Sequence, residues 1–190
     1  MKIIYRLRIA FTFTAALLIV GITQQLSAQT ATQRLSIIEE FTSATCYPCT
    51  TATAVLKPIV QLSNGVIAVR FHLFYPVLGD PFYMANRPEN DYRSRIYFGS
   101  NPGLPASRIN GHYDINPQQA ADVTNAIKLD QAQPYPVKIE VTQDKTNLTN
   151  VKVNVKVTSD IALTNYTLHT MVIASEIHLD KLPLLPDALR

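Results

Sequence analysis

The chain has 190 residues, of which 47% are hydrophobic and 16% charged, and its 17 Lys and Arg exceed its 14 Asp and Glu to give a formal charge of +3. This apolar content is enough to fill a core and excludes a disordered chain. Three of the basic residues fall within the first 28, and the remainder carries 14 charges of each sign. Such a balance argues against nucleic acid as a partner, because phosphate binding needs clustered Lys and Arg.

Residues 1–28 are predicted to be a secretory signal peptide. Lys2, Arg6 and Arg8 precede an apolar run of 14 residues at 9–22, and Leu-Ser-Ala at 26–28 is typical of a cleavage site. The alternative is an uncleaved anchor, but the run is shorter than the roughly 20 residues that a spanning helix needs. We therefore expect an exported mature chain of 162 residues without a transmembrane helix. Its expected location is the periplasm, or the outer membrane or cell surface.

Strand and helix patterns alternate in the next part of the chain. Residues 35–41 form a short apolar run that predicts a buried strand, and residues 50–62 carry apolar side chains at helical spacing. We expect that helix to kink or end near Lys57, because Pro58 cannot donate a backbone hydrogen bond. Residues 66–74 predict a second strand, and residues 81–97 predict a crossover helix.

A hairpin and a further helix are predicted next. Residues 106–109 and 112–114 flank Asn110-Gly111, which is a strong turn signal. Asn116 is expected to cap a helix that has Pro117 at its first position and Gln119 as the third-residue partner. The predicted order over residues 34–132 is strand-helix-strand-helix-strand-strand-helix, which indicates an α/β domain.

Beyond a proline-containing linker at 133–136, apolar residues recur at every second position. Residues 137–141, 151–157 and 166–173 each predict a half-buried antiparallel strand, so residues 133–190 are predicted to be an antiparallel β module. An immunoglobulin-like sandwich needs about seven strands. The module is therefore either an extension that packs on the preceding domain or an incomplete, partial immunoglobulin-like structure. The tail at 180–186 shows no strand pattern.

The two cysteines of the chain, Cys46 and Cys49, enclose Tyr47 and Pro48. A c-type haem site needs His after the second cysteine, where this chain has Thr50. Structural zinc needs four ligands, and the sequence has no second cysteine pair or His pair at finger spacing. An inert disulfide remains open, although so short a loop constrains the unfolded chain by only about 2 kcal/mol, against about 4.7 kcal/mol for a 100-residue loop. The spacing favours redox exchange, with no cofactor and no bound metal expected.

The predicted elements place Cys46 at or just before the N-terminus of a helix. Unpaired amide groups and the positive end of the helix dipole stabilise a thiolate there, and the thiolate is the nucleophile. Pro48 suits the first helical turn, where its missing N–H leaves nothing unpaired.

This stretch resembles the thioredoxin superfamily, and the resemblance implies a β-α-β-α-β-β-α fold for residues 34–132. Members often carry a buried acidic residue six positions before the first cysteine, where this chain has Glu40. They also have a cis-proline at the start of a later strand, which corresponds here to Pro105. The resemblance implies that Pro105 presents the Leu104 backbone to a substrate chain, beside Tyr47 and Pro48. The aromatic residue common before the first cysteine is replaced by Thr45, and the usual Gly-Pro dipeptide by Tyr-Pro.

A narrower resemblance is to the outer-membrane-associated thioredoxin-like proteins of Gram-negative bacteria, the twenty-eight-kilodalton Omp-related family. The matching features are Glu40-Phe41-Thr42, the pair at Cys46 and Cys49, Pro105, and Asn110-Gly111, together with a signal peptide and a β-rich C-terminal part. The two resemblances cover roughly residues 35–131. They imply that the protein associates with the outer membrane.

Two functions follow as hypotheses. In the first, Cys46 attacks a disulfide of an exported protein, Cys49 resolves the mixed disulfide, and Glu40 assists proton transfer, so the partners are exported protein thiols or disulfides and an unidentified redox partner. In the second, the domain is a non-enzymatic binding scaffold with a static disulfide. His72 ends a predicted core strand and could lie near Cys46, but a histidine at the rim of a core is the more common role.

Overall fold

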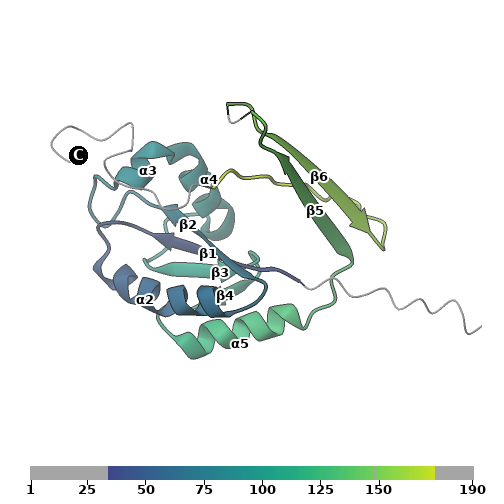
Figure 1. Ribbon diagram of the computed structural model, residues 1–190. Coiled ribbons are helices and arrows are strands. Elements are labelled where there is room, and N and C mark those ends of the chain that lie inside the picture. Colours follow the sequence, from purple (N-terminus) through teal and green to yellow (C-terminus); the bar gives the residue numbers. More distant parts are fainter. Residues whose placement is uncertain (1–33, 148, 174–190) are drawn as a thin grey trace, which may run out of the picture. The chain divides into compact units, whose positions relative to one another are not determined.

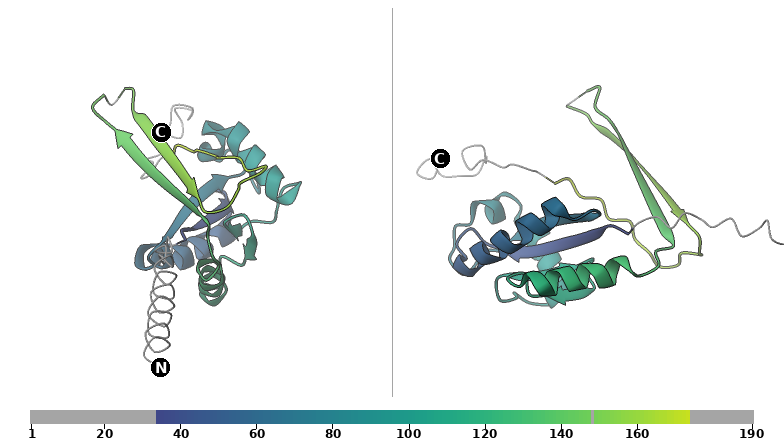
Figure 2. Two further views of the ribbon diagram at one scale, coloured as in Figure 1. Left: turned by 90° about the vertical axis from the view of Figure 1, so that its right-hand side faces the viewer. Right: turned by 60° about the horizontal axis from the view of Figure 1, so that its bottom comes forward.

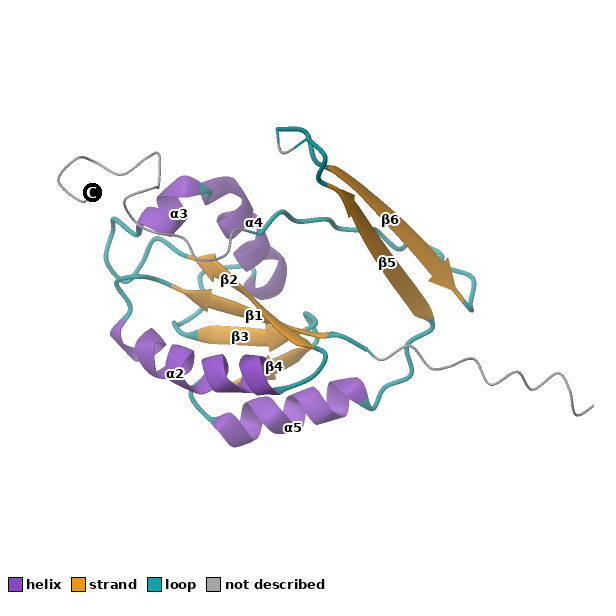
Figure 3. Ribbon diagram, viewed as in Figure 1, coloured by secondary structure: helices purple, strands orange, loops and turns teal. Residues whose placement is uncertain are grey.

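The computed structural model describes residues 34–147 and 149–173, so the predicted signal peptide and the tail at 180–186 lie outside the described residues. The elements in chain order are β1 (Ser36–Thr42), α2 (Tyr47–Leu62), β2 (Val66–His72), α3 (Pro81–Ala85), α4 (Arg87–Phe98), β3 (Ala106–Ile109), β4 (Tyr113–Ile115), α5 (Ala120–Gln131), β5 (Val137–Asp144) and β6 (Lys152–Ser159). The predicted α/β class is confirmed, since strands and helices are interspersed through residue 131 (Figure 3).

Four strands form a mixed sheet in the order β2-β1-β3-β4. Strand β1 runs parallel to β2 and antiparallel to β3, and β3 is antiparallel to β4. Helices α2 and α5 cover one face, and α3 and α4 lie on the other (Figures 1 and 2). Because Thr42 pairs with His72 and Phe41 with Ala106, strands β1 and β2 end where β3 begins. We call this the Cys46 end of the sheet, since the chain enters α2 there.

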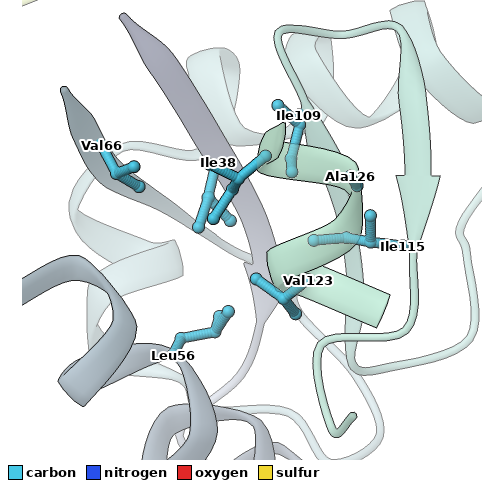
Figure 4. Close-up of a cluster of buried hydrophobic side chains, with 8 residues drawn as sticks. Ile38, Leu56, Val66, Ile109, Ile115, Val123 and Ala126 are labelled. Carbon is cyan, nitrogen blue, oxygen red and sulfur yellow. The ribbon is translucent and has the colours of Figure 1, made fainter. Parts of the chain in front are cut away.

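The core has one apolar cluster on each face of the sheet. The first joins β1, β2, β3 and β4 to α2 and α5, and Ile127 of α5 belongs to it. Figure 4 shows its other side chains pointing toward one another: Ile38, Leu56, Val66, Ile109, Ile115, Val123 and Ala126. The second consists of Phe41, Val69, Phe71 and Leu73, with Tyr97 and Phe98 of α4 packed against it. Even-numbered β1 residues thus face α2, and odd-numbered ones face α4, as the period of a strand requires.

Helix α2 continues past Pro58 to Leu62, so an early end near Lys57 is wrong, and the alternative, a kink there, stays a prediction. Leu56 is buried, and Ile59 and Val60 pack against the same apolar cluster. Burial of these side chains on both sides of Pro58 offsets the backbone hydrogen bond that the proline cannot make.

The predicted crossover helix at 81–97 is two helices rather than one. The chain leaves helical geometry at Asn86, where φ is −150° and ψ is 58°. Pro88 lies in the first turn of α4, and its missing N–H could not have continued the hydrogen bonds of α3.

The hairpin prediction at Asn110-Gly111 is confirmed, and both residues have positive φ, 49° and 65°. The helix that follows begins later than expected. Asn116 does not cap it; its side-chain oxygen accepts from the Gln118 backbone N–H at 3.0 Å in a local turn. Helix α5 therefore starts at Ala120, with Gln119 in the cap position.

Strands β5 and β6 form a separate two-stranded antiparallel sheet. The strand predicted at 166–173 is absent: this segment contains no strand in the described structure. Tyr166 is 72% exposed and Leu168 51% exposed, so no burial offsets the entropy cost of fixing an extended backbone. Among the described residues, no helix is both long and apolar enough to span a membrane.

Candidate functional site

Cys46 and Cys49 form a disulfide with a Cα–Cα distance of 5.4 Å. Cys46 is the N-cap residue of α2, and Pro48 lies in the first turn, as the sequence predicts. Cys46 is 4% exposed and Cys49 3%, whereas Tyr47 between them is 87% exposed. The disulfide therefore lies just below the surface at the positive end of α2, with an aromatic side chain projecting beside it.

Glu40 lies on the face of β1 that α2 covers, and it is fully buried. Its Oε2 accepts from Arg70 Nε at 2.6 Å, and Arg70 also lies 3.4 Å from Thr53 Oγ1 of α2. Its Oε1 has no hydrogen-bond partner among the described residues. A buried carboxylate with one open oxygen can accept or release a proton beneath the helix that carries the cysteines.

Pro105 comes directly before β3, so the register of β1 with β3 brings it to the Cys46 end of the sheet. The Leu104–Pro105 peptide bond is cis. Leu104 packs against the second apolar cluster. The predicted site residues Cys46, Cys49 and Pro105 are thus gathered at one end of the sheet, with Glu40 two residues before the end of β1.

Asp80 is a further residue of this end of the sheet, which the sequence-based prediction did not include. It is fully buried. Its Oδ1 accepts from the backbone N–H groups of Phe82 and Tyr83, and its Oδ2 accepts from Ala44 N at 2.6 Å and lies 2.8 Å from His72 Nδ1. An Asp directly before a Pro that opens a helix is an N-cap signature, and this signal could have identified the residue.

The surroundings of Asp80 favour its charged form. Burial alone raises the pKa of Asp80, but the hydrogen bonds from His72 and from the backbone of Tyr83 and Ala44 outweigh burial and hold the pKa below its ordinary value. His72 packs its ring against Phe82, with 4.6 Å between the ring centroids. The histidine is thus at the rim of the core and is also linked, through Asp80, to the loop that precedes Cys46.

The segment that leads from β1 to Cys46, residues 42–46, is tied to the segment after β2 at further points. Leu73 N donates to Thr42 O at 2.9 Å, and Thr45 Oγ1 donates to Val77 O at 3.1 Å. Within the segment, Cys46 N donates to Ser43 O at 3.1 Å. These bonds fix the backbone in front of the first cysteine independently of Asp80.

Glu39 faces away from α2 and is satisfied on the other face of the sheet. Arg93 and Tyr97 of α4 both donate to its carboxylate. Burial and then the hydrogen bond to Glu39 raise the pKa of Tyr97. This network joins α4 to β1 and does not reach the cysteines. In the part of the chain that the structure describes, no three His, Cys, Asp or Glu side chains are grouped to hold a metal ion.

Comparisons with known proteins found little that is similar. The chain matches no protein-family model and no curated protein. Among solved structures it is similar to the crystal structure of a protein from Agrobacterium tumefaciens, with 21% sequence identity and a TM-score of 0.45. The match covers 59% of this chain and 53% of that one, so the chain spans about half of that protein's length.

Proposed function

We propose that the protein is an exported thiol–disulfide oxidoreductase with a thioredoxin-like domain, which exchanges disulfides with other exported proteins. The observation that carries the proposal is the Cys46–Cys49 disulfide at the N-terminus of α2, with the open Oε1 of Glu40 on the face of the sheet beneath that helix. An inert bridge requires neither the helix terminus nor the buried acid.

The order of elements along the chain supports the thioredoxin-like part of the proposal. Strands and helices follow one another as β1, α2, β2, α3 and α4, β3, β4 and α5. With α3 and α4 in place of one helix, this is the β-α-β-α-β-β-α order that the resemblance implies. In this domain the N-terminus of α2 and the start of β3 lie at the same end of the sheet.

The chemistry conserves atoms and electrons. In the reducing direction, the Cys46 thiolate attacks a substrate disulfide, forms a mixed disulfide and releases one substrate thiolate, which takes up a proton. Cys49, after giving its proton to Glu40, attacks the Cys46 sulfur, so that the second substrate thiolate leaves and the Cys46–Cys49 disulfide forms. The substrate gains two electrons and the protein loses two. A dithiol of a redox partner restores the reduced state by the reverse steps.

A specific observation favours a second candidate function, a binding scaffold with a static disulfide. Both cysteines are at most 4% exposed, and a disulfide that never exchanges needs no more access than that. Exchange by contrast requires the substrate sulfur to reach Cys46 beside the exposed Tyr47. The two functions differ in whether a covalent intermediate forms.

A trapping experiment separates these functions. A Cys49→Ser variant, expressed with its export signal, is predicted to accumulate mixed disulfides through Cys46, because the resolving thiol is missing. The complexes are detected as adducts on non-reducing gels that reductant releases.

A Cys46→Ser variant is the matched control, since it keeps one cysteine but lacks the attacking thiol, and few adducts are expected. If the Cys49→Ser variant gives no more adducts than this control, and the wild-type protein neither reduces nor oxidises a test disulfide, the scaffold function is correct instead.

A further inference from the structure

Asp80 is contacted from three parts of the fold at the Cys46 end of the sheet. The loop before Cys46 contributes Ala44 N, strand β2 contributes His72 Nδ1, and helix α3 contributes the N–H groups of Phe82 and Tyr83. Nothing in the proposed exchange reaction uses this fully buried carboxylate. A cap for α3, a helix of five residues, needs only the two N–H groups of that helix.

The hydrogen bonds that Asp80 accepts determine which ring nitrogen of His72 carries the shared proton. An ionised carboxylate only accepts hydrogen bonds, so the proton between His72 and Asp80 resides on Nδ1 of the imidazole. His72 is the charged or titratable side chain that contacts Asp80, and its own other described contact is the Phe82 ring. The Asp80 carboxylate thereby holds a negative charge against Ala44 N, two residues before Cys46, and the imidazole of His72 offsets that charge.

We propose that Asp80 and His72 form a tuning pair for the Cys46–Cys49 couple: the Asp80 carboxylate opposes formation of the Cys46 thiolate, and His72 weakens that opposition. The inference rests on the proposed function and adds the residues that set its redox balance. Asp80 contacts the loop at Ala44 N, and neither residue touches the reacting sulfur, so both are positioning residues that act by charge.

The direction of the effect follows from the reaction. Two glutathione thiols reduce the disulfide: they give two electrons and one proton to the protein, which yields the Cys46 thiolate and the Cys49 thiol, and they become glutathione disulfide while the second proton passes to water. A nearby negative charge disfavours a thiolate, whereas the disulfide is neutral. Asp80 therefore shifts the equilibrium toward the disulfide.

Two substitutions are predicted to have opposite effects. In Asp80→Asn the amide oxygen still caps α3, but the negative charge is lost, and loss of that charge favours the thiolate. In His72→Asn the carboxylate stays, held by three backbone N–H groups, and loses its offsetting imidazole. The equilibrium constant for reduction by glutathione is expected to rise about three- to tenfold in the first variant and to fall in the second; tenfold corresponds to about 30 mV.

The readouts are the glutathione equilibrium at pH 7 and the rate at which iodoacetamide alkylates Cys46 in a Cys49→Ser background. The matched control is Asp91→Asn, because Asp91 accepts from Tyr83 Oη of α3 at 3.2 Å but has no bond to the loop. It is expected to leave both readouts unchanged.

Shifts of the two variants in the same direction, or no shift in either, would overturn the proposal, since general loosening of the loop moves both variants alike. If Asp80→Asn does not fold, His72→Asn decides alone: a lower constant supports the tuning pair, and an unchanged or higher one refutes it. Failure here leaves the trapping experiment untouched, because an adduct in the Cys49→Ser variant requires only attack by the Cys46 thiol and not a particular potential of the couple.

Discussion

Glu40 is the residue whose chemistry most directly separates an enzyme from a scaffold. It is fully buried, paired through one oxygen with Arg70, and open at the other. Glu40→Gln keeps the shape of the side chain but removes its ability to take a proton from Cys49. We predict that exchange with a test disulfide at neutral pH slows about tenfold or more, as expected when a general base is lost.

The control for Glu40 is Glu140→Gln, since Glu140 is a partly exposed carboxylate on β5 paired with Lys138 at 2.9 Å. The Glu140→Gln variant should exchange disulfides with the test substrate at the wild-type rate. Equal rates in both variants, with Glu40→Gln folded by circular dichroism, would mean that the buried acid serves only the ion pair with Arg70.

Some residues of the site could be predicted from a short stretch of sequence, and others could not. Cys46, Cys49 and Pro48 could be placed because a two-residue spacing and a helical pattern lie within one segment. The bond from Ala44 to Asp80 spans 36 positions, and that from His72 spans eight across a change of direction. No periodicity encodes which carboxylate will meet which amide, so the Asp80–His72 pair emerges only from the folded chain.

The geometry of the β3–β4 hairpin depends on the glycine in its turn. Gly111 has φ of 65°, and a Cβ at this position would lie 2.7 Å from Tyr97 Oη and 3.1 Å from its ring. Gly111→Ala is therefore predicted to lower the free energy of unfolding by about 1–3 kcal/mol, through backbone strain and displacement of Tyr97. Urea unfolding measures the change.

Gly103→Ala is the matched control, because a Cβ at Gly103 meets nothing within 4 Å and its φ is outside the positive range. We expect a change within about 0.5 kcal/mol, as for an ordinary surface substitution. A loss as large as that of Gly111→Ala would show that glycine in general, rather than this turn, is what the chain requires.

At the level of elements, the sequence predicted types better than boundaries. The strands, the hairpin turn and α2 follow from apolar period and turn chemistry. The two prolines led to opposite errors. An early helix end was expected near Pro58, but burial of neighbouring side chains lets α2 continue, whereas no helix break was expected at Pro88, where a new helix begins. At 166–173 an apolar pattern predicted a strand, but pairing requires a partner edge that the pattern does not supply.

For the whole molecule, the chemistry-bearing residues belong to the four-stranded domain. The disulfide, Glu40 and the Asp80–His72 pair all lie before residue 100, and β5 and β6 pair only with each other. The apolar side chains of this second sheet, such as Val141 at 55% exposure, are not part of either core cluster. The central claim is therefore confined to one end of one sheet.

The reduction potential of the Cys46–Cys49 couple, measured against glutathione buffers at pH 7, tests that claim most directly. An exchanging pair is predicted to fall between about −120 and −270 mV, the span of known thiol–disulfide oxidoreductases. A value below about −300 mV, where structural disulfides of secreted proteins lie, would contradict a role in exchange and assign the disulfide to the scaffold.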